Sequence, residues 1–265
     1  MEAAAQNRLG RSPRRSRRRP LLIAAGVVLL AVLAVGGYGL WYLFLQPAGP
    51  AAIADTSLPA VPTAASGSSQ PLGSSQPLGS GGIDGTWNVD TSIGSFADST
   101  SSFVGYRVQE QLASIGANMA VGRTPNVTGS MTISGTQVTA ATITADLTTL
   151  QSDDQRRDGQ LARQGIQTSE FPTATFKLTW PIDLGSVPAD GQETQVTATG
   201  QLTLHGQTKD VQIPLKARLS GSTITISGSL PIVFADYGIQ KPNSFAVLSI
   251  ADEGTMELQL FFTRA

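Results

Sequence analysis

Apolar and polar residues alternate along most of the chain over residues 83–265, which is the pattern of strands with one buried face. In the run VTATGQLTLH, Leu202 and Leu204 share one face, while Thr203 and His205 share the other. Similar runs cover residues 85–90, 101–108, 127–133, 137–147, 174–180, 211–219, 224–234 and 256–262. Turn residues separate the runs at short intervals, so we expect about eight to ten strands joined by tight connections.

Strands with a single apolar face favour an antiparallel sheet, because the strands of parallel sheets are usually buried on both faces. A parallel sheet also needs a crossover helix between successive strands, and most connections in this chain are too short to hold one. The fold class that follows is all-β, in the form of an antiparallel barrel or sandwich.

One segment, SDDQRRDGQLARQ at residues 152–164, lacks the alternation and has the features of a helix. Ser152 is a candidate N-cap, and the two aspartates that follow it favour a helix N-terminus. We therefore expect one short helix that crosses between two strands. Arg157 and Asp158 either lie on a solvated face of this helix or tie it to the mouth of the barrel.

The beginning of the chain has a different character. Residues 21–45 carry no charge, and a helix of this length, about 37 Å, is sufficient to cross a hydrocarbon core of about 30 Å. Residues 1–20 contain seven arginines and one acid, a charge bias that keeps the N-terminus in the cytoplasm. The sequence thus predicts a basic cytoplasmic N-terminus over 1–20 and a single transmembrane helix over 21–45, with a cleaved signal peptide as the alternative.

The segment between this helix and the strands is of low complexity. Residues 46–82 are rich in Pro, Ala, Ser and Gly, and the hexapeptide SSQPLG occurs at 68–73 and again at 74–79. Such a segment has too little apolar surface to offset the entropy cost of ordering its backbone. We expect a disordered linker over 46–82, followed by one β-barrel domain over 83–265.

Composition limits the available chemistry. The chain has no cysteine and a single histidine, so a zinc site would have to rely on carboxylates. The strand region contains neither a nucleophile elbow nor a glycine-rich phosphate loop. After the N-terminal arginines the chain is net acidic, which argues against a nucleic-acid partner. We expect no metal, no cofactor, no bound nucleic acid and no enzymatic activity.

The single histidine, His205, invites a catalytic interpretation because Lys209 and Asp210 follow it closely. It stands, however, at the end of one alternating run, directly before Gly206, a residue type that readily adopts the positive φ of a tight turn. The alternation resumes at Val211. We therefore interpret His205 and Gly206 as a hairpin connection and predict no catalytic residue.

An eight-stranded barrel has just enough interior space to hold one elongated small ligand. Ten apolar or aromatic side chains are candidates for contact with such a ligand, with ordinary core packing as the alternative for each. They are Phe103, Tyr106, Phe171, Phe176, Trp180, Leu202, Leu204, Ile213, Phe234 and Tyr237.

The order of short motifs along residues 83–265 resembles the YceI-like family of lipid-binding proteins. The motifs are WNVD at 87–90, SSFVGYRV at 101–108, RRDGQL at 156–161, FPTATFKLT at 171–179, GQLTLHGQTKDVQIPL at 200–215 and DYGI at 236–239. Each motif alone is weak, and six in the same order are fairly specific. Two positions depart from the family pattern, at 109–111, where a basic-His pair is usual, and at Phe234 and Ala235, where an Arg is usual.

The resemblance implies an extended eight-stranded antiparallel β-barrel, lipocalin-like, with one helix near residues 152–165. It also implies a hydrophobic channel that takes long amphiphiles such as polyisoprenoids, without catalytic chemistry. The two departures leave the preferred head group open.

These features together predict a membrane-anchored extracytoplasmic protein that holds an isoprenoid or other long-chain amphiphilic lipid. In this hypothesis residues 21–45 cross the cell membrane once, the N-terminus is cytoplasmic and the barrel lies outside. The alternative is an extracytoplasmic protein-interaction or stress-response module with a filled barrel and no ligand. The sequence leaves the oligomeric state open, with a homodimer as one option.

Overall fold

The computed structural model describes residues 29–38, 51–53, 58–61, 82–113, 116–243 and 247–265. The chain divides into two compact units, Met1–Pro47 and Ala48–Ala265. In the first unit, residues 29–38 form a helix; the rest of the expected transmembrane segment 21–45 lies outside the described residues. Within the parts of the chain that the structure describes, no helix has both the length and the apolar character needed to cross a membrane.

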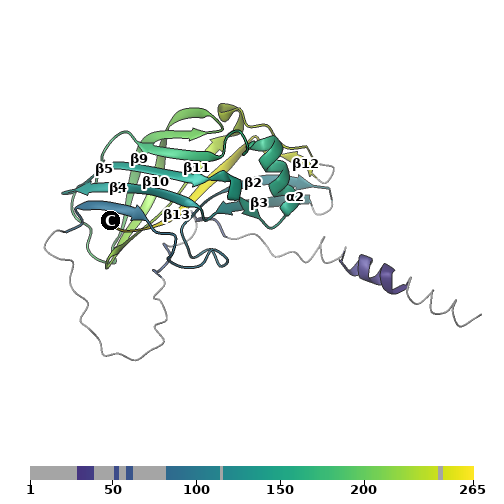
Figure 1. Ribbon diagram of the computed structural model, residues 1–265, viewed down its shortest axis with the longest axis horizontal. Coiled ribbons are helices and arrows are strands. Elements are labelled where there is room, and N and C mark those ends of the chain that lie inside the picture. The colour runs from purple at the N-terminus through teal and green to yellow at the C-terminus, as the bar shows by residue number, and fades with distance from the viewer. Residues whose placement is uncertain (1–28, 39–50, 54–57, 62–81, 114–115, 244–246) are drawn as a thin grey trace, which may run out of the picture. The chain divides into compact units, whose positions relative to one another are not determined.

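The second unit is built mainly from β-strands, which pair into one large sheet (Figure 1). Their bounds are β1 Gly85–Val89, β2 Phe103–Leu112, β3 Gly116–Thr124, β4 Val127–Ser134, β5 Gln137–Asp146, β6 Gln151–Ser152, β7 Thr173–Leu178, β8 Ile182–Asp183, β9 Glu193–Leu204, β10 Gln207–Ser220, β11 Thr223–Val233, β12 Val247–Ile250 and β13 Glu253–Arg264. Every strand pair is antiparallel, as the alternation predicts.

Eight of these strands close into a barrel, in the order β1-β4-β5-β7-β9-β10-β11-β13. The barrel closes because β1 pairs with β13 as well as with β4, with Trp87 opposite Arg264 and Val89 opposite Phe262. Closure leaves these eight strands without a free edge, which removes the tendency of exposed edges to aggregate. The predicted eight-stranded antiparallel barrel is confirmed.

The other strands extend the sheet beyond the barrel. β13 is long enough for residues 255–259 to pair with β2 while its last residues pair with β1. β3 and β6 continue the sheet from β2, β12 pairs with β2, and β8 pairs with β5. The sequence did not predict β3, because its second half, from Ala120 to Thr124, is buried residue after residue and shows no alternation.

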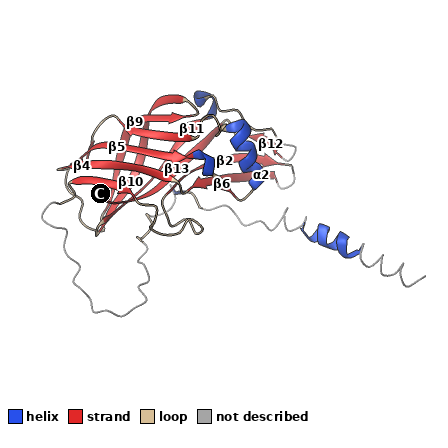
Figure 2. Ribbon diagram, in the orientation of Figure 1, coloured by secondary structure: helices blue, strands red, loops and turns tan. Residues whose placement is uncertain are grey.

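The expected helix over 152–164 is present, and its start differs from the prediction. α2 covers Gln155–Gln160 and continues into a π-helical turn, η3, over Leu161–Gly165 (Figure 2). The N-cap is Asp154, whose carboxylate accepts a hydrogen bond of 2.8 Å from the backbone N–H of Arg156. Ser152 instead donates its hydroxyl to Asp158 at 2.6 Å. Two short 3-10 helices, η2 Leu147–Thr149 and η4 Phe234–Tyr237, were not predicted.

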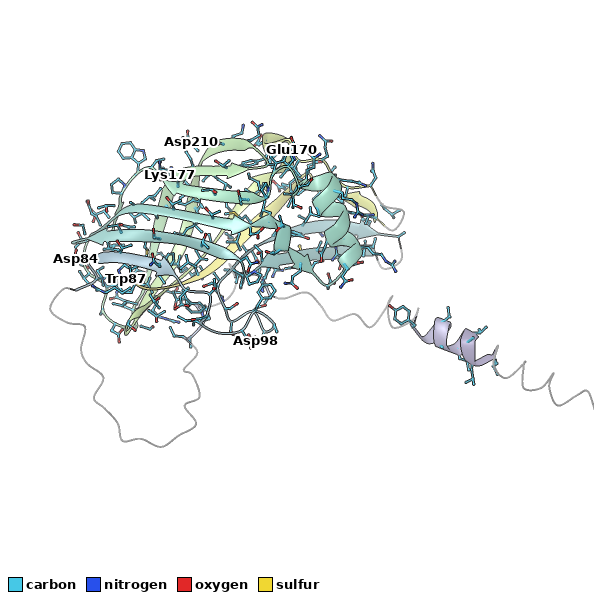
Figure 3. All side chains as sticks on the ribbon, viewed as in Figure 1. Asp84, Trp87, Asp98, Glu170, Lys177 and Asp210 are labelled. Carbon is cyan, nitrogen blue, oxygen red and sulfur yellow. The ribbon has the colours of Figure 1, made fainter. Side chains whose placement is uncertain are left out.

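The alternation of each barrel strand places its apolar side chains inside and its polar side chains outside. Trp87 is completely buried in the interior and donates its indole N–H to the carbonyl oxygen of Ile83 at 2.9 Å. Polar side chains such as Lys177 and Asp210 are exposed, and their positions are labelled in Figure 3. The barrel interior is therefore the apolar core of the unit.

Candidate functional site

The barrel interior contains an apolar cavity of about 150 Å³. Side chains of β2, β4, β5, β7, β9, β10, β11 and β13 line it. Among the residues that line it, Thr194 and Arg218 are the only polar ones. The site thus offers hydrocarbon contact along its length and polar groups only at one place.

Small side chains in the wall leave room for this cavity. Ala141, Ala145, Ala174, Ala198 and Ala217 all line it, at positions where a larger residue would fill the interior. These alanines were not among the predicted binding residues, because the prediction was limited to larger apolar and aromatic side chains. In runs such as VTATG and ATITA the alternation places the alanines on the inward face, and this pattern could have identified them.

One end of the barrel is closed around His205. This residue and Gly206 form the two-residue connection between β9 and β10, with φ of 51° and 72° respectively. The His205 Nδ1 donates to the carbonyl oxygen of Tyr237 at 2.9 Å, and Nε2 lies 3.0 Å from Oε1 of Gln167. The Phe171 ring packs on the imidazole with 4.3 Å between ring centroids. The prediction that His205 belongs to a hairpin connection is confirmed, and its buried ring fastens three segments together.

The opposite end of the barrel carries the polar part of the lining. Thr194 stands at the start of β9, Arg218 near the end of β10, and Pro188 in the loop before β9. We call this the polar end of the cavity. A ligand with an apolar tail and a polar head would match this arrangement with its head at the polar end.

Three of the ten candidate residues line the cavity. Phe176 on β7 and Leu202 on β9 are paired neighbours in the sheet, and Ile213 lies on the adjacent β10. The Phe176 ring lies over Gly200, where an added Cβ would come within 2.6 Å of the ring. These three side chains form a continuous patch of the wall.

The other seven candidates lie outside the lining. Leu204, Phe234 and Tyr237 pack on the core, and Phe171 packs on His205, near the closed end. Phe103 is completely buried, with the Arg123 guanidinium 4.2 Å from its ring centre.

Trp180 and Tyr106 complete the set. Trp180 is 69% exposed, in the loop after β7. The Tyr106 ring lies against Gly122 on β3, and its buried hydroxyl has no hydrogen-bond partner among the described residues. Burial raises the pKa of this phenol well above its usual value.

Two charged networks lie outside the cavity. On the outer face, Glu257 of β13 accepts from Arg107 Nε at 2.6 Å and from Arg123 Nη2 at 3.5 Å. The Glu257 side chain is 1% exposed, so this triad is shielded from water. Its role is structural, since it joins β13 to β2 and β3.

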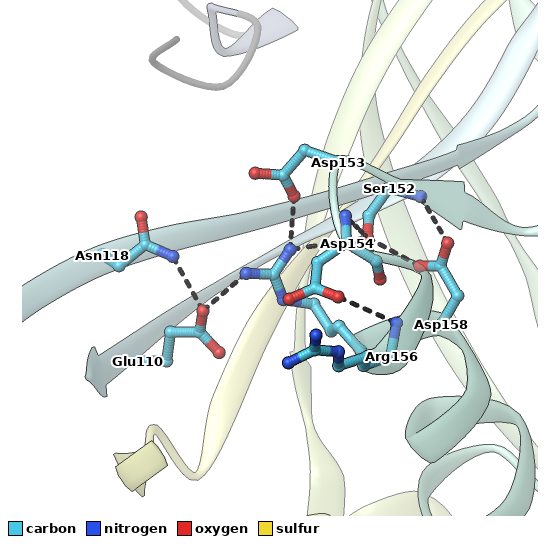
Figure 4. A network of polar contacts seen from close by, with 8 residues as sticks. Glu110, Asn118, Ser152, Asp153, Asp154, Arg156 and Asp158 are labelled. Atoms are coloured by element: carbon cyan, nitrogen blue, oxygen red, sulfur yellow. Dashed lines mark hydrogen bonds and ion pairs between the residues drawn. The ribbon is translucent and has the colours of Figure 1, made fainter. Parts of the chain in front are cut away.

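The second network fastens α2 to the sheet extension (Figure 4). Arg157 binds Glu110 of β2 at 2.9 Å and also contacts Asp153, and Asn118 of β3 donates to Glu110 at 2.7 Å. Asp158 accepts from both the backbone and the hydroxyl of Ser152. Arg157 and Asp158 thus tie the helix to β2 and β6, and not to the mouth of the barrel as the second interpretation expected.

The described residues contain no group of His, Asp and Glu side chains that could hold a metal ion. His205 was the residue considered for a catalytic role. Its ring contacts Tyr237 and Gln167 at the closed end of the barrel, and it does not line the cavity. The cavity wall, with Thr194 and Arg218 as its polar members, is suited to contact with an apolar group.

Comparison with known proteins identifies the family and the fold. The YceI-like domain matches residues 96–262. The fold is similar to a polyisoprenoid-binding domain from Saccharophagus degradans, at 20% identity and a TM-score of 0.53, over 69% of this chain and 99% of the other. No curated protein sequence matches the chain.

Two further solved structures match at lower structural similarity. Burkholderia cenocepacia BcnA shows 22% identity and a TM-score of 0.47, over 60% of this chain and 95% of BcnA. The Campylobacter jejuni YCEI protein shows 15% identity and a TM-score of 0.45, over 54% of this chain and 84% of that protein. Because the domain match extends over more than half of the sequence, the chain belongs to the YceI-like family.

Proposed function

We propose that this protein is a lipid-binding protein whose barrel cavity holds the hydrocarbon tail of an isoprenoid or a similar long amphiphile. The observation that carries this proposal is the cavity wall, which is apolar apart from Thr194 and Arg218. Transfer of hydrocarbon from water into such a wall contributes about 0.8 kcal/mol per methylene group. The tail alone therefore supplies most of the affinity, with few polar contacts needed.

The size of the cavity limits how the tail is held. At about 150 Å³ it is as large as an engineered cavity that binds benzene, and smaller than the roughly 300 Å³ at which pockets for drug-sized ligands begin. A long isoprenoid chain thus enters only if lining side chains move or if part of the chain extends past the polar end. Met131 and Met256 line the cavity, and the flexible thioether side chain adapts most readily to such repacking.

The proposed binding residues are the three candidates in the wall, Phe176, Leu202 and Ile213, together with the wall alanines. We place the head group at the polar end beside Thr194, since the Arg218 guanidinium faces outward and donates to the carbonyl oxygens of Leu58 and Pro59. Support for an isoprenoid in particular comes from the Saccharophagus degradans domain, a polyisoprenoid-binding domain with the same fold. YceI-like binding proteins are generally non-enzymatic, and we propose no reaction for this chain.

We also propose that residues 21–45 anchor the protein in the cell membrane, with the N-terminus in the cytoplasm and the barrel outside. The uncharged stretch and the preceding arginines support this orientation. Protease added to intact cells should remove the barrel while the N-terminus stays protected. Protection of both ends of the chain would contradict the orientation.

The filled-barrel alternative gains no support from the fold, because the barrel interior retains a cavity. The experiment for lipid binding is to purify residues 48–265, which form one compact unit, and to analyse an organic extract by mass spectrometry. The proposal predicts a co-purified amphiphile, or uptake of an added polyprenyl lipid by the emptied protein. An empty barrel that takes up no added lipid would overturn it.

A further inference from the structure

A short segment before the barrel lies on the outer face of the barrel. Residues 51–53 and 58–61, which we call the strap, contact β13 and β10 from outside. Ile53 is 7% exposed and Leu58 is 4% exposed. Both residues belong to the segment 46–82, for which the sequence predicts a disordered linker and most of which lies outside the described residues.

The first part of the strap is held by the buried ion triad. The backbone N–H of Ile53 donates to Glu257 Oε1 at 3.0 Å. The carbonyl oxygen of Ala51 accepts from Arg107 and, at 3.5 Å, from Arg123. The triad has two guanidinium groups and one carboxylate, so the electronegative carbonyl oxygen of the strap faces its excess positive charge.

The second part of the strap is held at the next strands. Arg218 Nη2 donates to the carbonyl oxygen of Leu58 at 3.1 Å and also to that of Pro59. Between the two attachment points, Thr225 and Ser227 occupy outward positions on β11, yet they are 0% and 3% exposed. Outward polar residues of a barrel are ordinarily in water, so their burial shows that this part of the outer face is covered.

We propose that the strap is a permanent part of the folded domain and that its docking shortens the free linker between the barrel and the membrane anchor. This inference rests on the proposed membrane anchor. If the anchor ends at residue 45 and the docked chain begins at Ala51, five residues remain between them, and the six Cα–Cα steps that they create reach at most about 20 Å. A free linker over 46–82 would reach six times as far when extended, with a typical span of roughly 35 Å.

A short free linker determines where lipid is exchanged. A barrel held within about 20 Å of its anchor takes up or delivers its ligand at the membrane in which it is anchored. A barrel on a free linker could instead carry the ligand some way across the cell envelope. Docking of the strap thus favours local exchange over transport between membranes.

The test uses the full chain in lipid nanodiscs. The chain has no cysteine, so Asp210→Cys gives a single labelling site for a fluorescent donor on an exposed part of β10. Acceptor lipids then report the distance from the barrel to the bilayer by energy transfer. The strap-release variant is Ile53→Lys with Leu58→Lys, which places positive charges at two buried positions near guanidinium groups, and the matched control is Ala60→Lys at an exposed strap position.

Hydrogen exchange measured on the same samples reports docking directly. We expect the Ile53 amide to be protected about 100-fold in the wild type and in the control, and unprotected in the release variant. Energy transfer should fall about twofold in the release variant alone, since the barrel then explores the longer tether. Protection at Leu260 in β13 verifies that the barrel itself stays folded.

Three results would overturn the inference. An unprotected Ile53 amide in the wild type would show that the strap is not docked, and unchanged energy transfer on strap release would show that docking does not set the distance. Failure of the chain to insert into nanodiscs would contradict the membrane anchor and therefore also the short free linker. None of these readouts depends on lipid in the cavity, so failure of lipid binding is seen separately.

Discussion

The imidazole of His205 donates a hydrogen bond of 2.9 Å to the carbonyl oxygen of Tyr237, and this contact joins the β9–β10 turn to the 3-10 helix η4 at the closed end of the barrel. His205 does this from a left-handed backbone conformation, with φ of 51°. Its role follows from two separate features, the turn conformation and the ring contacts. Substitutions can separate the two.

His205→Asn keeps a residue that tolerates the left-handed conformation and removes the ring contacts with Phe171 and Gln167. We expect the free energy of unfolding to fall by about 1–2 kcal/mol, as for the loss of one or two hydrogen bonds. His205→Val adds the strain of a β-branched residue at positive φ, a further cost of about 1–2 kcal/mol. Urea titrations measure both values. Equal losses for the two variants would show that the turn conformation is unimportant.

Glu257 compensates two buried guanidinium groups, those of Arg107 and Arg123. Glu257→Gln removes that charge, and breaking a buried ion pair costs about 3–5 kcal/mol. The matched control is Asp252→Asn, in which the lost partner of Lys241 is 90% exposed. The control should cost less than about 1 kcal/mol. Similar unfolding free energies for the two variants would contradict the structural role of the triad.

Arg157 and Arg156 are adjacent on α2 and differ in their contacts. Arg157 pairs with the buried Glu110, whereas Arg156 is exposed. Arg157→Ala leaves a carboxylate in a site that is 5% exposed, at an expected cost of about 3 kcal/mol. Arg156→Ala should change the free energy of unfolding by less than about 0.5 kcal/mol. A chemical denaturation series checks the difference, and equal effects would show that the network in Figure 4 does not fasten the helix.

Because the phenol of Tyr106 is buried, we expect the free energy of unfolding to depend on pH in the alkaline range. Burial raises the pKa of its phenol above the value of about 10 in the unfolded chain. A group with a raised folded pKa stabilises the fold fully below the unfolded pKa, and this contribution is lost as the pH rises above about 10 toward the folded pKa. The free energy of unfolding of the wild type should thus fall above a pH of about 10, and that of the Tyr106→Phe variant should fall less.

At neutral pH the same variant should be at least as stable as the wild type. Tyr106→Phe removes a buried hydroxyl that has no hydrogen-bond partner among the described residues, and an unsatisfied buried group costs about 1–3 kcal/mol. Unfolding curves at neutral and alkaline pH measure both effects. A parallel decline of the two proteins above pH of about 10 would show that another group is responsible.

The barrel strands could be predicted from the sequence because their alternation is a local property that burial on one face imposes. β3 could not, since its residues from Ala120 to Thr124 are all buried and show no alternation. The cap at Asp154 was missed for a similar reason. Ser152 and Asp154 are both good caps, and the contact of Ser152 with Asp158 decides between them.

The candidate site was harder to predict than the fold. Parity identified the inward faces, and thus Leu202 and Ile213, but it does not tell a filled interior from a cavity. That distinction depends on volumes summed over all strands, in which the alanines matter as much as the aromatics. Trp180 shows that a large aromatic residue in a strand-like run need not be buried, because its side chain is 69% exposed in a loop.

Whether the cavity holds the lipid tail is decided by a matched pair of variants on β9. Ala198→Phe fills the cavity wall from inside, while Thr197→Phe adds the same side chain at the exposed neighbouring position. The measurement is the affinity of each protein for a fluorescent polyprenyl lipid. We expect Ala198→Phe to weaken binding by about tenfold or more, through loss of roughly two methylene contacts, and Thr197→Phe to bind like the wild type. Unchanged binding by a folded Ala198→Phe variant would contradict the claim.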